Sequence, residues 1–484
     1  MSVMKVLRVL LVVLAAFVFV ACNRCNDQTE DYEMNEIYGQ VSSPICFDTA
    51  SYIFERLDAI LYADNGYHWG ISLHGPVVIT DAITRYAIAN MPDIDGEIFI
   101  RQGSFYVGQL PEQTHIGNTA SYFGGRLWGM ITLGLIEANL DNLDWVVDIL
   151  LHELFHAKQP LIFEGERTRS GSNPPHLREV NSRISIQLEI NALLAALRAT
   201  GDERLSIVHD ALSIRTQRRT ATDINAALEE NIFEIVEGTA VYTEAALGRE
   251  NLSDRIALIE RNMDIDGYNV VEQFGYHTGA LYALLLDEFN IDWRIGLSWE
   301  ADLAALLKEG IGLNEVIPFD AIDLERYGYS EVRFFQEEWV AETERLTQEA
   351  QDAFSGPILL IDATGEFIVG YGEGIRLLFL QGIELYNHEK FDYGQEDIHL
   401  LVGERFDERT VFYGSITYVA EFGELQVRGG HLMLWSVMWR HGIPAYSLKF
   451  DGNSIIGSNW VLTLNEGFEL REVAGGHFRI IEMH

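Results

Sequence analysis

Basic residues are scarce in this chain of 484 residues. Lysine and arginine together number 34, against 73 aspartates and glutamates, and the formal net charge is −39. A surface this negative repels the phosphates of nucleic acids and of anionic lipid headgroups, which argues against both as partners. Salt would screen the repulsion between these negative charges. We interpret the acidity as a feature that keeps the protein soluble.

Cysteine is also rare, and the three in the chain are Cys22, Cys25 and Cys46. None of them indicates a catalytic thiol. Cys25 and Cys46 could form one disulfide in an oxidising compartment, provided that their geometry allows it. The chain also has neither an internal repeat nor a low-complexity tract.

A membrane-spanning run is lacking, but the N-terminus has a shorter apolar segment. Lys5 and Arg8 precede an unbroken apolar run over 9–21, which is too short for a comfortable span and is typical of an export signal. The stretch "FVAC", ending at Cys22, resembles the lipobox of bacterial lipoproteins, although Phe19 replaces the usual leucine. The resemblance implies that Cys22 becomes a lipidated first residue that anchors the protein in the cell envelope, on the periplasmic or surface face. The alternative is an ordinary cleaved signal peptide.

The texture of the sequence then changes three times. Residues 22–45 are polar and acidic, which predicts a flexible tether. Residues 50–90 show helical spacing, whereas 96–134 contain short β-branched and aromatic runs divided by glycine, proline and asparagine. The pattern then predicts helices, at 142–158, 177–200, 202–219, 222–248, 252–262, 271–290, 299–309 and 331–354.

The last part of the chain returns to short apolar runs bounded by glycine, asparagine or aspartate, which predicts an all-β domain with a sandwich or barrel form. The predicted fold class is therefore α+β. Residues 1–21 are the signal peptide and 22–45 the tether. Residues 46–354 form a domain with a small sheet and a mainly helical part, and 355–484 form the β domain.

The stretch "DILLHELFHAKQ" lies in the first long predicted helix, which should stop before Pro160. His152 and His156 are four residues apart, so on a helix both imidazoles project from one face. Two imidazoles at that separation can share one tetrahedral zinc ion, and Glu153 beside them can accept a proton. The alternative is an amphipathic helix with imidazoles on one side. Burying these groups without a partner would cost several kcal/mol, which favours the metal.

A third ligand should come from a neighbouring element. In "EENIFEIVEGTAVYTEAAL" the residues Glu237 to Ala240 follow the pattern E-G-x-A. Together with H-E-x-x-H this resembles the gluzincins, and among them the zinc aminopeptidase family. The resemblance implies a zincin-like catalytic domain with Glu237 as the third zinc ligand. Glycine inside a helix costs about 1 kcal/mol relative to alanine. Gly238 is expected to offset this loss by letting its helix approach the metal helix closely.

Glu234 and Glu189 are alternatives for the third ligand. If neither binds the metal, they are expected to orient the histidines by hydrogen bonds. A purely structural role is also open to them, as partners of the basic cluster Arg215, Arg218 and Arg219.

The segment "FGYHTGALYALLLDEF" resembles the downstream Y-x-x-G-A/x segment of the same family. The resemblance implies that Tyr276 stabilises the oxyanion of a tetrahedral intermediate, and His277 beside it is a second candidate for that role. The alternative is that Tyr276 is a core aromatic and His277 a satisfied surface residue.

Two features depart from the family. Residues 157–236 separate the second histidine from the third ligand, so two extra helices must be inserted. The G-x-M-E-N element that anchors a substrate's amino terminus is missing, since "WGMITL" has Gly129 and Met130 but no Glu-Asn after them. That stretch is still expected to be the sheet edge along which an extended peptide lies.

These patterns predict an exported, lipid-anchored zinc metallohydrolase, most simply a peptidase acting on peptide or protein substrates. His152, His156 and Glu237 would hold the zinc, with Glu153 as general base and Tyr276 or His277 at the oxyanion. The alternative is a zincin-like binding or scaffold lipoprotein without catalytic activity. The presence of Glu153 favours the enzyme.

Overall fold

The computed structural model describes residues 45–167, 175–220, 224–263, 270–354 and parts of 356–483. The predicted signal peptide, the lipidation site Cys22, the tether up to residue 44 and Cys25 lie outside the described residues. Among the residues that are described, no helix is both long enough and apolar enough to cross a membrane.

The chain mixes helix and sheet and has a β region at its C-terminal end, as the sequence predicts at this coarse level. It divides into two compact units. The first comprises 1–176, 189–265 and 271–323, and the second comprises 177–188, 266–270 and 324–484. The predicted domain boundary at residue 355 lies inside the second unit.

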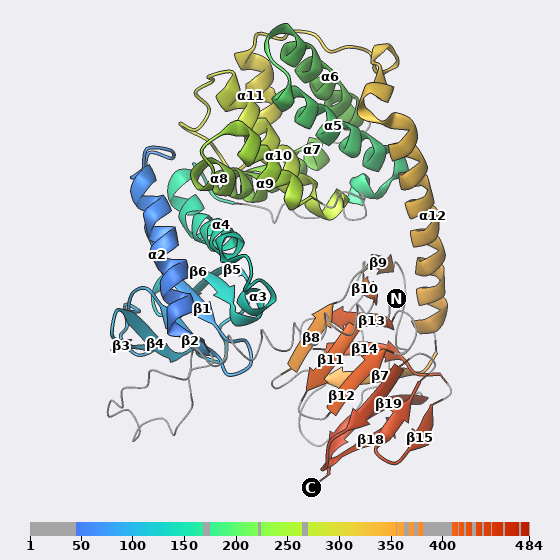
Figure 1. Cartoon of the computed structure of the whole chain (residues 1–484). Coiled ribbons are helices and arrows are strands. Elements are labelled where there is room, and N and C mark those ends of the chain that lie inside the picture. Colours follow the sequence, from blue (N-terminus) through green and yellow to red (C-terminus); the bar gives the residue numbers. More distant parts are fainter. Residues whose placement is uncertain are drawn as a thin grey trace, which may run out of the picture. The chain divides into compact units, whose positions relative to one another are not determined.

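The first unit begins with a helix and a six-stranded sheet (Figure 1). The order of the strands is β3-β4-β2-β1-β6-β5, in which β1 and β6 run parallel and the other neighbours antiparallel. Val78, Ala87, Phe99, Trp128 and Met130 contribute to the core of the sheet. The elements are α2 (Phe47–Asp64), β1 (Val77–Thr80), β2 (Tyr86–Ala89), β3 (Phe99–Gln102), β4 (Phe105–Gln109), β5 (Thr119–Phe123) and β6 (Arg126–Thr132).

Two predictions for this sheet are wrong. The helical spacing over 50–90 holds only for α2, because "VVIT" and "YAIA" form the buried strands β1 and β2. Runs of four apolar residues in the centre of a sheet carry no alternation and therefore no strand signal. The stretch "WGMITL" is not the edge of the sheet either, because β6 lies between β1 and β5. The edge strand on this side is β5.

Helix α4 (Leu143–Ile162) packs against β6 and carries the two histidines. A Cβ atom added at Gly129 would lie 2.7 Å from the backbone nitrogen of Leu154, so only glycine allows the strand to approach the helix this closely. The predicted stop before Pro160 is wrong, since α4 continues through it to Ile162. Because proline has no backbone N–H, one intrahelical hydrogen bond is missing there. The helix ends at the hydrogen bond that the Phe163 nitrogen donates to the Gln159 carbonyl.

Further helices follow the sheet in the chain and make up most of the first unit (Figure 1), although residues 177–188, which include the start of α5, belong to the second unit. Helices α5 and α6 are the two long helices expected between the motifs. Helices α7 and α8 form one run that is interrupted by the π-helical turn η2. The elements are α3 (Leu133–Ala138), η1 (Pro175–Arg178), α5 (Val180–Arg198), α6 (Gly201–Thr220), α7 (Ile224–Phe233), η2 (Glu234–Gly238), α8 (Thr239–Gly248), α9 (Leu252–Arg261), α10 (Val270–Glu288), α11 (Leu303–Gly310) and η3 (Phe319–Ala321).

The second unit holds η4 (Leu324–Tyr327), the long helix α12 (Tyr329–Phe354) and two sheets. The sheets have the orders β18-β19-β7-β14-β13-β10-β9 and β15-β16-β17-β12-β11-β8, and residues of both share one core that includes Leu359, Ile443, Leu425 and Trp460. The strands are β7 (Ile358–Asp362), β8 (Phe367–Tyr371), β9 (Arg376–Leu380), β10 (Arg409–Gly414), β11 (Ile416–Ala420), β12 (Gly423–Val427), β13 (Leu432–Val437), β14 (Arg440–Pro444), β15 (Lys449–Asp451), β16 (Ser454–Ile456), β17 (Trp460–Leu464), β18 (Phe468–Val473) and β19 (His477–Glu482).

Candidate metal centre

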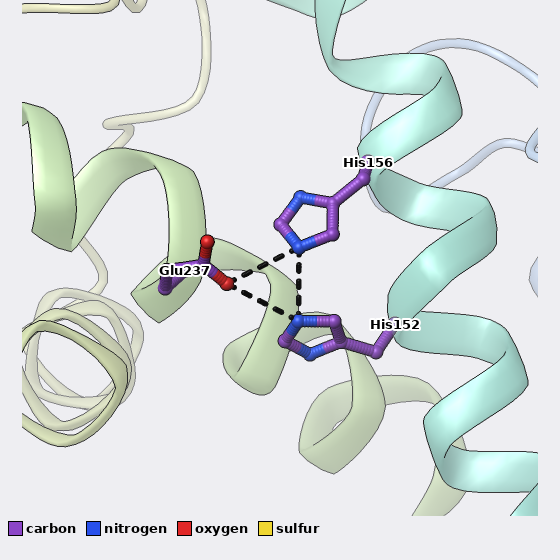
Figure 2. A group of neighbouring side chains, drawn as sticks. All are labelled: His152, His156 and Glu237. Atoms are coloured by element: carbon purple, nitrogen blue, oxygen red, sulfur yellow. Dashed lines mark hydrogen bonds and ion pairs between the residues drawn. The ribbon is translucent and has the colours of Figure 1, made fainter. Parts of the chain in front are cut away.

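Three side chains that the sequence singles out meet at one point between α4 and η2. Figure 2 shows His152 and His156 projecting from one helix toward Glu237 on the facing segment. The two Nε2 atoms are 2.9 Å apart, and Glu237 Oε2 lies 3.4 Å from Nε2 of His152 and 3.2 Å from Nε2 of His156. Across the described residues, this is the group of histidine, cysteine, aspartate and glutamate side chains that could hold a metal ion.

Each of the two imidazoles has a hydrogen-bond partner behind it, on the side away from Glu237. His152 Nδ1 lies 2.5 Å from Oε1 of Glu244, and His156 Nδ1 lies 3.0 Å from Oε1 of Gln159. The amide of Gln159 is oriented by its own donation to the Val236 carbonyl at 2.6 Å. Each partner offers an acceptor oxygen, so a proton on each Nδ1 would leave a lone pair on each Nε2. In that tautomer three electron-pair donors face one another, which is the arrangement that a metal ion requires.

The donor set fits zinc. Zinc takes imidazole nitrogen and carboxylate oxygen at about 2.0–2.2 Å, and tetrahedral geometry then separates the ligand atoms by about 3.3–3.6 Å. The separations of 2.9, 3.2 and 3.4 Å lie close to that spacing. Two histidines and one carboxylate are also a ligand set of catalytic zinc sites, which leave one position open.

Glu237 owes its position to a π-helical turn between α7 and α8. Short π segments inside α-helices occur often at functional sites, because the extra residue redirects the side chains of one turn. The turn packs against α10 through glycines on both sides. A Cβ atom at Gly238 would lie 2.5 Å from the Gly279 Cα atom, and one at Gly279 would lie 2.5 Å from the Glu234 carbonyl oxygen. The prediction that Gly238 allows close approach to the metal helix is therefore wrong, since the close partner is α10.

Glu153 and Tyr276 complete the wall of a cleft beside the three ligands, with a volume of about 520 Å³. The ring of Tyr276 is nearly parallel to that of His152, with their centroids 6.1 Å apart. The edge strand β5 and the residue before it supply another wall. The cleft is lined by Asn118, Thr119, Ala120, Leu127, His152, Glu153, His156, Gln159, Pro160, Arg167, Val236, Glu237, Tyr276 and Trp299.

His277 lies away from this cleft. It is 5% exposed and is not among the described residues that line the wall. Its Nε2 atom is 3.4 Å from Oε1 of Gln273, one turn earlier on α10, and burial lowers its pKa to about 4. Of the two residues predicted for the oxyanion, the structure brings Tyr276 to the three ligands and not His277.

The two rival glutamates are far from ligand geometry. Glu234 forms a bidentate ion pair with Arg215, with N to O distances of 2.6 and 2.5 Å. Glu189 pairs with Arg215 at 3.0 Å and with Arg218 at 2.9 Å. Neither contacts a histidine of the site, so the expectation that they orient the histidines is wrong, and the structural role opposite the arginines is the observed one.

The side chains that form hydrogen bonds with the two histidines are those of Glu244 and Gln159. Neither of them was identified from the sequence. Glu244 is 1% exposed and lies on α8, seven residues after Glu237 and hence two helical turns along the same face. Gln159 follows His156 by three residues, which also places the two on one face. These spacings could have identified Glu244 and Gln159 from the sequence alone. The charges of Glu234 and Glu189 directed the prediction to those two residues instead.

The charges in the site act on one another. Burial opposes protonation of His152, but the carboxylates of Glu244 and Glu237 outweigh it and raise its pKa well above 6.5. For Glu237 burial is outweighed in the same way by hydrogen bonds from the two histidines, which lower its pKa. Burial raises the pKa of Glu153, and burial together with the charge of Glu237 raises that of Tyr276. Tyr276 is thus a neutral hydroxyl donor, and Glu153 is a stronger base than a solvated carboxylate.

Comparison of the chain with protein families, with curated proteins and with solved structures finds no match.

Proposed function

We propose that this protein is a zinc-dependent hydrolase of gluzincin type, most simply a peptidase. One observation carries the proposal, namely the convergence of two imidazole nitrogens and a carboxylate oxygen within 3.4 Å in a cleft that also contains Glu153 and Tyr276. When both imidazole protons are on Nδ1, these three atoms are all acceptors, and a bound cation stabilises that arrangement. The neighbouring carboxylate and phenol are the groups that hydrolysis needs.

Each side chain has a definite task in this proposal. His152, His156 and Glu237 hold the zinc, which when bound supplies a Lewis acid and lowers the pKa of water. Glu153 takes a proton from the attacking water and can return it to the leaving amine, so that one water is added across the C–N bond. Tyr276 donates a hydrogen bond to the oxygen of the scissile carbonyl as negative charge develops there.

The edge strand supports a peptide as the substrate. Thr119 and Ala120 of β5 line the cleft, and β5 ends the sheet on that side. An extended peptide can add to such an edge by backbone hydrogen bonds, which would bring its scissile bond toward the three ligands. The missing amine anchor does not favour an aminopeptidase, so the proposed enzyme cleaves within peptides.

Export and a lipid anchor at Cys22 belong to the same proposal. They are supported by the N-terminal sequence alone, from Lys5 to Cys22, and they would place the enzyme in the cell envelope. Extracting the protein with detergent and weighing its first peptide by mass spectrometry tests the anchor. A diacylglyceryl group on Cys22 is expected, and an unmodified N-terminus would contradict it.

The mechanism is tested by comparing Glu153→Gln with the wild-type protein in a peptide-library digest read by mass spectrometry. Loss of the base should lower kcat by about 10²–10⁴-fold while zinc content stays unchanged. Glu166→Gln is the control, because Glu166 is an exposed carboxylate just beyond α4 and should change neither quantity.

Retained cleavage by Glu153→Gln would reject the assigned base. A wild-type protein that holds zinc but cleaves no peptide, ester or amide would favour the alternative of a binding or scaffold lipoprotein with a zincin-like core. Zinc content alone does not separate these two functions, which is why the variant is needed.

A further inference from the structure

A cluster of buried ions lies behind the metal centre, in the first unit. Arg215 is 3% exposed and contacts Glu234 and Glu189, both fully buried. Arg218 and Arg219 continue the cluster one turn later by pairing with Glu230. Asp302 closes it at the start of α11, 2.9 Å from Arg219 and 3.6 Å from Arg215.

This cluster reaches the π-helical turn through Glu234. Glu234 is the first residue of η2, three positions before Glu237. Both of its oxygens accept from the guanidinium of Arg215, and Oε1 also accepts from the Thr278 hydroxyl at 2.7 Å. The carboxylate is therefore fixed from α6 on one side and from α10 on the other.

The position of Arg215 in the sequence gives this contact its meaning. Helix α6 belongs to the segment between His156 and Glu237, and it supplies the guanidinium that holds the turn on which Glu237 sits. A π-helical turn is rare and interrupts the regular α-helix around it, so contacts from outside the turn help to fix one arrangement of its side chains. Bidentate pairing with a planar guanidinium fixes both the position and the orientation of a carboxylate.

We propose that Arg215 is a positioning residue for the metal centre, which acts through Glu234 to hold the π-helical turn and thereby the carboxylate of Glu237. The inserted helix α6 is then part of the machinery that organises the site. This inference rests on the proposed metal site, and it assigns to Arg215 no contact with substrate or metal.

The test uses conservative variants of the full-length protein. Arg215→Lys keeps the charge and loses the bidentate pairing, and Glu234→Gln keeps the shape and loses the charge. Arg218→Lys is the matched control, since Arg218 is equally buried on the same helix and has two ion pairs, with Glu189 and Glu230 and not with η2. Zinc affinity is measured by competition with a chelator of known affinity, and hydrogen exchange of peptide 234–240 is measured in the metal-free protein.

Arg215→Lys and Glu234→Gln should each weaken zinc binding by about 10–100-fold, against less than about threefold for Arg218→Lys. Exchange of peptide 234–240 should become faster in the first two variants and stay at the wild-type rate in the control. Unchanged affinity, or equal losses at Arg215 and Arg218, would overturn the positioning role.

The two proposals fail in different ways. A wild-type protein that binds no zinc rejects the metal site, and the exchange data then still decide whether Arg215 orders the turn. Wild-type zinc binding together with unchanged affinity and exchange in Arg215→Lys rejects the positioning role alone.

Discussion

The first unit contains two buried polar clusters built on one helical run, and they are organised in opposite ways. Glu230 and Glu234 meet the guanidinium groups of Arg215, Arg218 and Arg219, so donors and acceptors alternate. Glu237, one turn further on, meets the Nε2 atoms of two imidazoles. The first cluster is neutralised by the chain itself, whereas the second offers three ligand atoms to the zinc ion that we propose. The role of each glutamate on this helical run is therefore set by the side chains that face its carboxylate.

The largest effect is expected from breaking the closed cluster. Arg218→Met leaves Glu189 and Glu230 short of a positive partner in the protein interior, which should lower the free energy of unfolding by about 3–5 kcal/mol in urea denaturation. Arg198→Met is the control, because its ion pair with Glu260 is exposed and should contribute less than about 1 kcal/mol. Similar losses in the two variants would mean that the buried cluster is not structural.

A second way to disturb the comparison is to push the π-helical turn away from α10. Gly238→Ala places a methyl group against the Gly279 backbone and should cost about 3 kcal/mol in the free energy of unfolding. Gly134→Ala, in α3, meets no atom within 4 Å and should be neutral or stabilising by up to about 1 kcal/mol. Thermal and urea unfolding of both variants measure the difference. A harmless Gly238→Ala would contradict the close packing of η2 on α10.

His277 contrasts with His152, because burial lowers the pKa of His277 whereas neighbouring carboxylates raise that of His152. Burial lowers the pKa of His277 from 6.5 to about 4, so the unfolded chain binds the proton first as the pH falls. Stability from this residue is complete above pH 6.5 and is lost as the pH falls toward 4, which amounts to about 2–3 kcal/mol near pH 4.5. His277→Gln should lose less stability than the wild type over that interval in urea titrations. Equal losses would show that the imidazole is protonated inside the folded protein.

The smallest effect concerns the hydrogen bond behind His152. Glu244→Gln keeps an acceptor for Nδ1 but removes the charge, and should weaken zinc binding about tenfold, or about 1.4 kcal/mol. Isothermal titration with zinc measures this, with the exposed Glu250→Gln as control. If both variants bind zinc like the wild type, Glu244 does not tune the site.

The sequence predicted the helical part of this protein well. Long segments of period 3.6 from α4 to α12 are real, and the two inserted helices are α5 and α6. Periodicity works where a helix exposes one face and buries another, as α9 and α12 do. It fails at β1 and β2, which are buried throughout and too short to show alternation.

The candidate site was predictable in part. His152, His156 and Glu237 lie together as their motifs indicate, since the spacing along a helix fixes which side chains share a face. Of their supports, Gln159 shares a face of α4 with His156, but Glu244 and Arg215 act across helices whose packing no local pattern specifies. The charge of Glu234 suggested a contact with the histidines, but only the position of α6 shows that a guanidinium takes it.

The central claim is that His152, His156 and Glu237 form a zinc site, and metal content tests it most directly. Wild-type protein, the His152→Ala/His156→Ala variant and a His74→Ala control, whose imidazole is exposed, would be purified and their zinc measured by mass spectrometry. About one zinc per chain is expected in the wild type and the control, and none in the double variant. An absence of zinc from the wild type, or its retention in the double variant, would contradict the account.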